Sequence, residues 1–267
     1  MDKTIARGPK TLFYREEGSG LPVVLLHGFA EDGAIWNKQV EQLKSGYRLL
    51  IPDLPGSGHS SSLTDETSME KMAEDILLLL DREDIQYCAL IGHSMGGYIA
   101  LAFAEKYPER LVGLGLFHST AYADTEEKKT VRQKSIEFIR KNSSAAFIRQ
   151  SIPNLFSADT RNSRPELIRD MIDRYSGFSP DALVYYYEAM IRRPDRTTVL
   201  EQLKNPVLFV IGAHDQAVPP LQALQQSHIP ALSHIHVLTH SGHAGMLEEP
   251  DEANRILQSF LNFVTHS

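Results

Sequence analysis

The stretch Gly92-His93-Ser94-Met95-Gly96-Gly97 joins two segments of different character. Before it, residues 87–91 form a short apolar run of the kind that a buried parallel strand produces. After it, apolar side chains recur with helical spacing until Pro108. A serine on such a strand-to-helix turn is held in a strained backbone conformation that exposes its hydroxyl. The pattern Gly-x-Ser-x-Gly in this setting predicts that Ser94 is a nucleophile.

A serine hydroxyl needs a base and an orienting acid before it can attack a substrate. The chain offers both after later strand-like runs. Asp215 follows the apolar run at residues 207–212, and His243 lies in the loop after the run at 236–239. This order of serine, acid and histidine is found in hydrolases whose nucleophile lies on such a turn. We predict a catalytic triad of Ser94, Asp215 and His243.

Asp124 is a second candidate for the acid, because it follows the apolar run at residues 111–117. The pattern Asp124-x-x-Glu127, however, is that of a capping box with aspartate at the helix start. Asp215 lies immediately after an apolar strand-like run. We therefore favour Asp215 as the acid and expect Asp124 to cap a helix.

Apolar runs alternate with helical patterns along the chain, which predicts an α/β fold with a mostly parallel, doubly wound sheet. Strands are expected near residues 11–15, 22–27, 47–52, 86–92, 111–117, 206–212 and 234–239. Helices are expected near residues 34–44, 68–82, 95–107, 196–203, 220–227 and 250–264. Thr67-x-x-Glu70 predicts a capping box for the second of these helices.

The segment between the strands at 111–117 and 206–212 is much longer than a simple crossover requires. Its apolar residues recur with helical spacing, and Ser179-Pro180 is typical of a helix start. We predict a helical cap of residues 119–194, inserted before the last strands into a core of residues 1–118 and 195–267. The apolar face of the cap would wall a pocket at the carboxyl ends of the strands. Cationic side chains at 128–134, namely Lys128, Lys129, Arg132 and Lys134, are expected on a solvated helix face.

Several spaced motifs resemble those of the α/β-hydrolase superfamily, in its subgroup of small capped hydrolases. His27-Gly28-Phe29 with Trp36 resembles the oxyanion strand, residues 53–60 resemble the loop after the next strand, and Tyr107-Pro108-Glu109-Arg110 resembles the end of the helix after the nucleophile. The resemblance covers the whole chain. It implies that the backbone N–H groups of Phe29 and Met95 hold an oxyanion, leaving both side chains free to shape the pocket.

The resemblance also implies hydrolysis of carboxylic esters with small to medium, largely apolar acyl groups through an acyl-enzyme. A serine nucleophile disfavours haloalkane dehalogenases and epoxide hydrolases, which use aspartate, and the residues after His27 differ from those of proline iminopeptidases. Perhydrolases and carbon–carbon hydrolases share the triad and stay open. A lyase of quinone biosynthesis would need Arg149, Arg192 or Arg193 in the pocket. A ligand-sensing or signalling protein with slow turnover is a further alternative.

The composition restricts the partners of the chain. Its formal net charge is −7 over 267 residues, and it has no Lys/Arg-rich tract, so we expect a small-molecule substrate and neither nucleic acid nor membrane. The 11 histidines show no metal-ligand spacing, and we expect no metal and no other cofactor. Cys88 is expected to be a buried, unreactive residue. With neither a signal-peptide pattern nor a membrane-spanning run, the sequence predicts a cytoplasmic monomer or small homo-oligomer.

Overall fold

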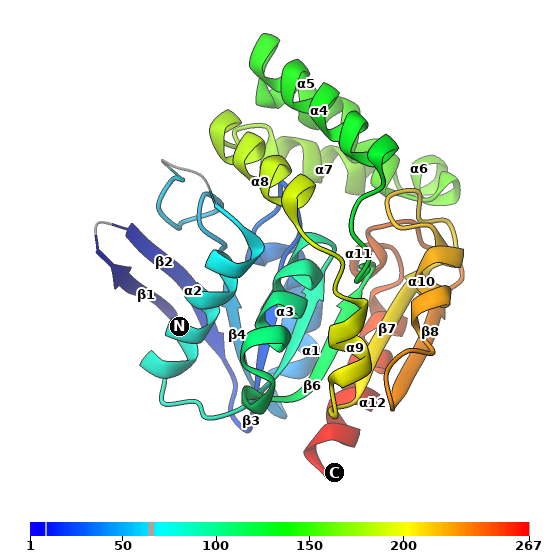
Figure 1. Ribbon diagram of the computed structural model, residues 1–267. Helices are drawn as coiled ribbons and strands as arrows, with labels where there is room; N and C mark the ends of the chain where they lie inside the picture. Colours follow the sequence, from blue (N-terminus) through cyan, green and yellow to red (C-terminus); the bar gives the residue numbers. More distant parts are fainter. Residues whose placement is uncertain (9, 64–66, 267) are drawn as a thin grey trace.

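The computed structural model describes residues 1–8, 10–63 and 67–266. In these residues one sheet of eight strands has the order β1-β2-β4-β3-β5-β6-β7-β8 (Figure 1). The strands are β1 (Asp2–Arg7), β2 (Lys10–Glu17), β3 (Leu21–Leu26), β4 (Tyr47–Pro52), β5 (Cys88–His93), β6 (Leu111–Phe117), β7 (Val207–Gly212) and β8 (Ser233–Leu238). β2 runs antiparallel to β1 and β4, and the other neighbours are parallel. The prediction of a mostly parallel sheet is confirmed.

The sequence did not indicate β1, which pairs with β2 at the edge of the sheet. Ile5 is the one residue of residues 1–6 that is buried, so the strand has no apolar run. An edge strand needs little apolar surface, because one of its sides is open to solvent. Pairing with β1 extends β2 to Lys10, and pairing with β4 extends it to Glu17, beyond the predicted range of 11–15.

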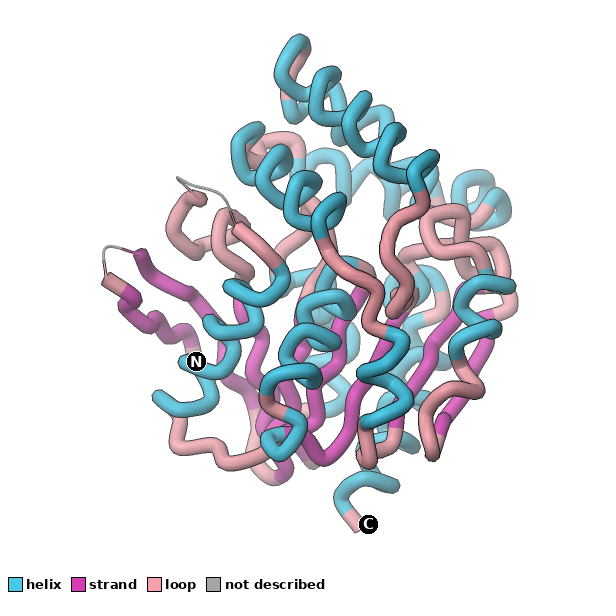
Figure 2. The backbone as a smooth tube through the Cα atoms, viewed as in Figure 1, coloured by secondary structure: helices cyan, strands magenta, loops and turns pink. Residues whose placement is uncertain are grey.

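Helices cover both faces of the sheet (Figures 1 and 2). One face carries α2 (Met69–Arg82), α3 (Met95–Lys106), α9 (Thr197–Gln202) and α10 (Pro220–Gln226), and the other carries α1 (Asn37–Leu43) and α12 (Pro250–Thr265). A short α11 (Gly245–Glu248) precedes α12, and single turns of 3₁₀ helix lie at Gly33–Trp36, Pro108–Arg110 and Ile152–Leu155. This arrangement confirms the doubly wound architecture.

The start of α2 lies one residue beyond the predicted cap. The Ser68 hydroxyl accepts the backbone N–H of Lys71, whereas Thr67 does not cap the helix. The prediction that Thr67 begins a capping box was wrong, because two hydroxyl residues are adjacent and the second has the helix-start geometry. Ser68 satisfies one of the unpaired N–H groups of the first turn.

Between β6 and β7 the chain leaves the sheet and forms a layer of helices over the carboxyl ends of the strands (Figure 1). These helices are α4 (Glu126–Lys141), α5 (Ser144–Ser151), α6 (Ala158–Ser163), α7 (Pro165–Tyr175) and α8 (Pro180–Arg192). The Ser179 hydroxyl accepts the N–H of Ala182, which confirms the predicted helix start. The helical insertion is confirmed, while the division into core residues 1–118 and 195–267 and cap residues 119–194 stays a prediction.

The central strand β5 is buried at all six of its residues and leads directly to Ser94. Cys88 at its start is fully buried, and burial raises the pKa of the thiol to about 12. The thiol therefore stays protonated, as expected of a cysteine that serves as a small apolar residue. The rigid core around this strand fixes the turn that follows it.

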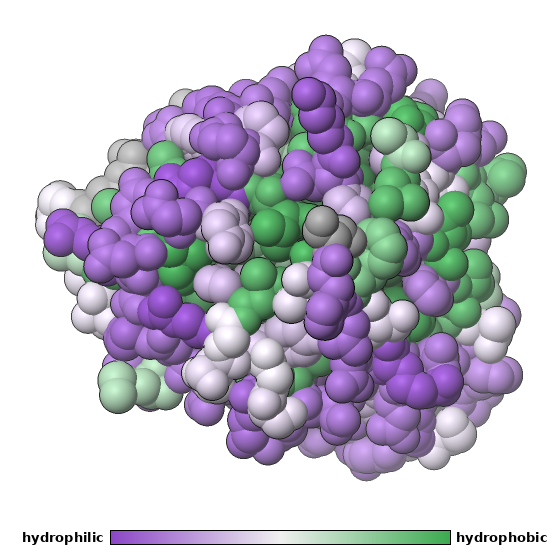
Figure 3. Space-filling model, turned by 90° about the horizontal axis from the view of Figure 1, so that it is seen from below, coloured by the Kyte–Doolittle hydropathy of each residue, from purple (hydrophilic) through white to green (hydrophobic). Residues whose placement is uncertain are grey.

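The face opposite the cap is mainly hydrophilic (Figure 3). Hydrophobic residues gather on the side where β8 and α10 lie. Ile235 and Val237 of the edge strand β8 are exposed. Among the described residues, we find no helix with both the length and the apolar composition needed to cross a bilayer.

Candidate active site

Ser94 lies on the turn between β5 and α3, as the sequence predicts. Its φ of +50° and ψ of −114° fall in a region that residues with a side chain rarely adopt. The turn is tight, since a Cβ atom on Gly92 would lie 2.3 Å from the backbone of Gly96. The Ser94 N–H donates to the Phe117 carbonyl at 2.9 Å, and the Ser119 hydroxyl donates to the Ser94 carbonyl at 2.7 Å. Bonds to the end of β6 thus hold Ser94 in its strained conformation.

Asp215 and His243 meet through a hydrogen bond of 2.7 Å between Oδ2 and Nδ1. The other carboxylate oxygen, Oδ1, accepts the N–H groups of Ala217 and Val218 at 2.8 and 2.9 Å. Burial would raise the pKa of Asp215, but the imidazoles of His243 and His118 hold it well below its usual range. An ionised Asp215 requires a proton on Nδ1 of His243, so Nε2 of the neutral ring is free to accept one.

The cap helps to position the His243 loop. The His243 N–H donates to the Leu155 carbonyl at 2.6 Å. The Glu248 carboxylate accepts the N–H groups of Gly242 and Ser157, each at 2.8 Å. A segment of the insertion and the loop after β8 are therefore joined by hydrogen bonds next to the imidazole.

A second imidazole, that of His118, lies beside Asp215. Its Nδ1 is 3.4 Å from Asp215 Oδ2 but makes no hydrogen bond there, and the ring is fully buried. Burial lowers the pKa of His118 to about 4, so the ring is neutral at neutral pH. No motif in the sequence singles out this residue. Its place directly after β6, at the carboxyl edge of the sheet, was the available signal.

Glu31 and His93 form a buried ion pair beneath the Ser94 turn, with 2.9 Å between Oε2 and Nδ1. Glu31 Oε2 also accepts the Gly28 N–H at 2.7 Å, and His93 Nε2 lies 2.9 Å from the His243 carbonyl. Both His93 nitrogens face acceptors, an arrangement that favours the protonated ring. Burial would lower the pKa of His93, but the Glu31 carboxylate raises it. No motif in the sequence predicts this pair, which ties the loop after β3 to the His243 loop.

The two residues predicted to hold an oxyanion come from two different segments of the chain. Met95 is the first residue of α3, where N–H groups lack acceptors within the helix. Phe29 follows β3, and its ring packs on Tyr187 of the cap with ring centroids 4.2 Å apart. The Met95 side chain is fully buried and does not line the cavity. The expectation that it shapes the pocket was wrong, because the start of α3 directs it into the core.

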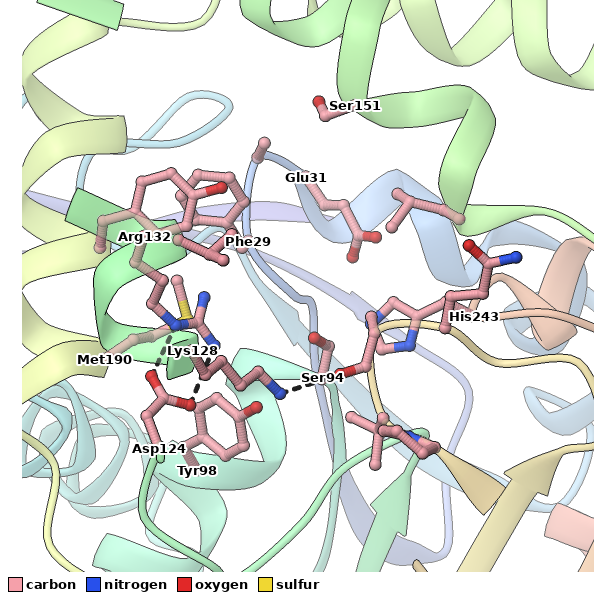
Figure 4. A pocket seen from close by; sticks show the side chains of 18 of the residues that line it. Phe29, Glu31, Ser94, Tyr98, Asp124, Lys128, Arg132, Ser151, Met190 and His243 are labelled. Carbon is pink, nitrogen blue, oxygen red and sulfur yellow. Dashed lines mark hydrogen bonds and ion pairs between the residues drawn. The ribbon is translucent and has the colours of Figure 1, made fainter. Parts of the chain in front are cut away.

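A cavity of about 540 Å³ lies between the carboxyl edge of the sheet and the cap helices. Ser94, His243 and Phe29 line it together (Figure 4). Much of the remaining wall is apolar and comes from Val131, Phe147, Ile152, Leu155, Met171, Tyr187, Met190 and Val218. The volume is within the range of about 300–1,000 Å³ usual for sites that bind small molecules.

Asp124 does not cap α4, because the Thr125 hydroxyl accepts the Lys128 N–H instead. The Asp124 carboxylate contacts two arginines, with 2.6 Å to Arg132 Nε and 3.0 Å to Arg193 Nη2. Burial would raise the pKa of Asp124, but both guanidinium groups lower it. The capping prediction was wrong, since a neighbouring hydroxyl serves the helix start and the carboxylate is the counter-ion of the arginines.

The cationic residues of α4 do not all face solvent, contrary to the expectation for residues 128–134. Lys128 and Arg132 are one helical turn apart and both line the cavity, and the Arg132 side chain is 12% exposed. Lys134 is exposed as expected, and Lys129 is partly exposed and pairs with Glu126 at 2.8 Å. The prediction of a solvated helix face was therefore wrong for Lys128 and Arg132.

Of the three arginines considered for a lyase, Arg193 lines the cavity, whereas Arg149 is exposed on α5. Arg192 is exposed and donates to the Thr67 carbonyl, and it is not part of the cavity wall. Within residues 1–8, 10–63 and 67–266, no three histidine, cysteine or acidic side chains come close enough to hold a metal ion.

Comparisons with known proteins agree on one family. A family model described as alpha/beta hydrolase fold matches residues 22–250. A malate-bound structure of a thermophilic esterase from Thermogutta terrifontis superposes with a TM-score of 0.93 at 31% identity, covering 99% of both chains. The pimeloyl-[acyl-carrier protein] methyl ester esterase of Aeromonas salmonicida (strain A449) is 30% identical over 253 residues, which are 91% of this chain and 96% of that protein.

A longer relative matches as well. The dihydrolipoyllysine-residue acetyltransferase component of the acetoin cleaving system of Pseudomonas putida is 29% identical over 248 residues. The match covers 91% of this chain but spans 64% of the length of that protein.

Proposed function

Because the chain belongs to the α/β-hydrolase family, we propose that it hydrolyses carboxylic esters, with Ser94 as nucleophile, His243 as base and Asp215 as the orienting acid. The observation that carries the proposal is the 2.7 Å hydrogen bond between His243 and Asp215, beside a cavity that His243 shares with Ser94. A carboxylate that fixes one imidazole nitrogen leaves the other nitrogen to accept a proton from the nucleophile.

In the proposed reaction, Nε2 of His243 takes the Ser94 proton as Oγ attacks the acyl carbon. Asp215 keeps the imidazole in the productive tautomer and stabilises its cationic form. The backbone N–H groups of Met95 and Phe29 bind the oxyanion. The proton then passes from His243 to the departing alcohol. Water attacks the acyl-enzyme with His243 as base, which releases the acid and restores Ser94.

The cavity supports small to medium acyl groups, since its volume of about 540 Å³ is bounded mainly by apolar side chains of the cap. Two of the similar proteins are ester hydrolases by description, the thermophilic esterase and the methyl ester esterase. This similarity favours ester hydrolysis over carbon–carbon or peracid chemistry, for which the same triad would also serve.

A panel of esters with different acyl and alcohol groups tests the proposal. We expect the wild-type protein to hydrolyse short and medium esters, and Ser94→Ala to lower kcat by about 10⁶, as loss of a triad serine does elsewhere. The thermal unfolding midpoint of Ser94→Ala serves as the control for folding. A wild-type protein that cleaves no ester but cleaves a carbon–carbon bond, or only binds ligands, would contradict ester hydrolysis.

A further inference from the structure

We propose that the end of the cavity formed by Lys128 and Arg132 binds a carboxylate of the substrate. The preferred substrates would then be esters with a free carboxylate remote from the scissile bond. This inference rests on the ester hydrolysis proposed above and names the substrate class of the same site. It adds an anionic end, on the acyl or the alcohol half, to the largely apolar substrate expected above.

The charges at this end of the cavity do not balance. Three cations line it, Lys128, Arg132 and Arg193, and among the described residues Asp124 is the one carboxylate paired with any of them. The other acidic residue of the wall, Glu31, is held by His93. Two positive charges are therefore in surplus on a wall partly shielded from water. Such charges are stabilised when an anion pairs with them.

Arg132 has donors left after binding Asp124. Its Nε and Nη2 donate to the two Asp124 oxygens at 2.6 and 3.5 Å, and its Nη1 donates to no group in the part of the chain that is described. The guanidinium lies 5.6 Å from the Tyr187 ring centroid, which restricts its orientation. Arg193, in contrast, also donates to two backbone carbonyl groups and stacks on Tyr98 at 3.8 Å. Arg132 is thus the arginine that can bind an anion.

Lys128 supplies the second positive group. Its Nζ donates to the Ala217 carbonyl at 2.9 Å, and no carboxylate within the described ranges is at ion-pair distance from it. An ammonium has three donors, so two remain. In Figure 4 the Lys128 side chain runs from the group of Asp124 and Arg132 toward Ser94.

A carboxylate between Lys128 Nζ and Arg132 Nη1 would accept charge-assisted hydrogen bonds from both, which are about twice as strong as neutral ones. The apolar side chains of the cavity wall would contact the hydrocarbon part of the substrate. The geometry does not depend on which half of the ester carries the carboxylate. Both halves are therefore arms of the experiment.

The experiment compares matched substrates that differ by one charge. In the acyl arm, monomethyl esters of glutaric, adipic, pimelic and suberic acids are each paired with the dimethyl ester. In the alcohol arm, butyryl esters of hydroxycarboxylic acids are paired with the corresponding methyl carboxylates. In at least one arm we expect the charged substrate to have a kcat/KM about tenfold or more above that of its neutral partner.

Two variants test whether Lys128 causes the preference for the charged substrate. Lys128→Met should lower the ratio of charged to neutral kcat/KM by about tenfold to a hundredfold, the usual worth of a hydrogen bond to a charged group. Using this ratio cancels any effect on the Asp215 loop through Ala217, because that effect would act on both substrates. Lys134→Met removes the same charge from an exposed position of α4 and should leave the ratio and the activity unchanged.

The outcomes separate the inference from the proposed function. If neutral esters are cleaved and neither arm shows a preference for the charged partner, or Lys128→Met keeps the ratio, the inference is overturned while ester hydrolysis stands. If no ester is cleaved, the proposed function fails, and calorimetric titration of a monoester into the Ser94→Ala protein decides the inference. Binding that is weakened by Lys128→Met and kept by Lys134→Met supports the inference. An absence of binding overturns the inference.

Discussion

Asp124 and Asp215 follow neighbouring strands of the sheet, and both are buried, yet their partners have different chemistry. Asp215 lies between the imidazoles of His243 and His118, and Asp124 lies between two guanidinium groups. An imidazole gains and loses a proton near neutral pH, whereas a guanidinium stays charged. An aspartate beside histidine can support proton transfer, but one between arginines acts only as a counter-ion. The chemistry of the groups that contact each aspartate therefore decides its role, and its position after a strand does not.

The two aspartates also divide the cavity. The Asp215 region places the His243 imidazole on the same cavity wall as Ser94, and we propose that it is the reacting end. The Asp124 region keeps a surplus of positive charge on Lys128 and Arg132 and so forms the binding end. One cavity with these two ends would position an anionic substrate relative to the nucleophile.

The largest expected effect concerns Asp215. Asp215→Asn should lower kcat by about 10⁴, because the amide favours the wrong His243 tautomer, as in another enzyme with a serine–histidine–aspartate triad. The loss is measured with one activated and one unactivated ester, so that both acylation and deacylation are monitored. Thermal unfolding of the variant checks that the fold is kept. A loss below about tenfold would show that Asp215 does not orient the base.

Asp124→Asn should affect stability more than turnover. Removing the Asp124 carboxylate leaves the buried charges of Arg132 and Arg193 uncompensated, and such losses are typically about 3–5 kcal/mol. Chemical denaturation measures the free energy of unfolding. The decrease in kcat should be far smaller than that of Asp215→Asn. The comparison fails if Asp124→Asn stays folded and loses the 10⁴ in turnover while Asp215→Asn keeps its activity.

The smallest effect on turnover is expected for His118→Gln, since His118 is neutral and makes no hydrogen bond to Asp215. Burial lowers the pKa of His118 in the folded protein to about 4, below the ordinary value of 6.5. The folded protein therefore favours the neutral ring, so this contribution to the free energy of unfolding is fully present above about pH 6.5 and is lost as the pH falls toward 4. The shift corresponds to about 3 kcal/mol.

The measurement for His118 is the free energy of unfolding of both proteins between pH 7 and pH 4. The wild-type protein should lose stability on acidification more steeply than His118→Gln. Parallel curves would show that His118 does not titrate as described.

The sequence predicted those parts of the fold and site that depend on local pattern. The apolar run before Gly92 and the helical spacing after Met95 placed the Ser94 turn, and the ends of two later runs placed Asp215 and His243. The structure brings the last two into contact and puts His243 and Ser94 on one cavity. Their roles in catalysis stay proposals that the variants above test.

The sequence did not predict the features that depend on contacts between distant segments. Glu31 meets His93 across 62 positions of the chain, and no local pattern links them. The charged neighbours of Arg132 predict a solvated helix face, but the helix turns the Arg132 side chain toward Asp124. The helical period shows which residues share one face of a helix, but only the packing of the helix shows which face is buried.

The most direct test of the central claim locates the nucleophile. The protein is treated with a serine-directed phosphonate, and mass spectrometry of its peptides identifies the labelled residue. We expect one adduct, on Ser94, which is absent from Ser94→Ala and forms more slowly in Asp215→Asn. An adduct on another serine, or equal labelling of the Ser94→Ala protein, would contradict it.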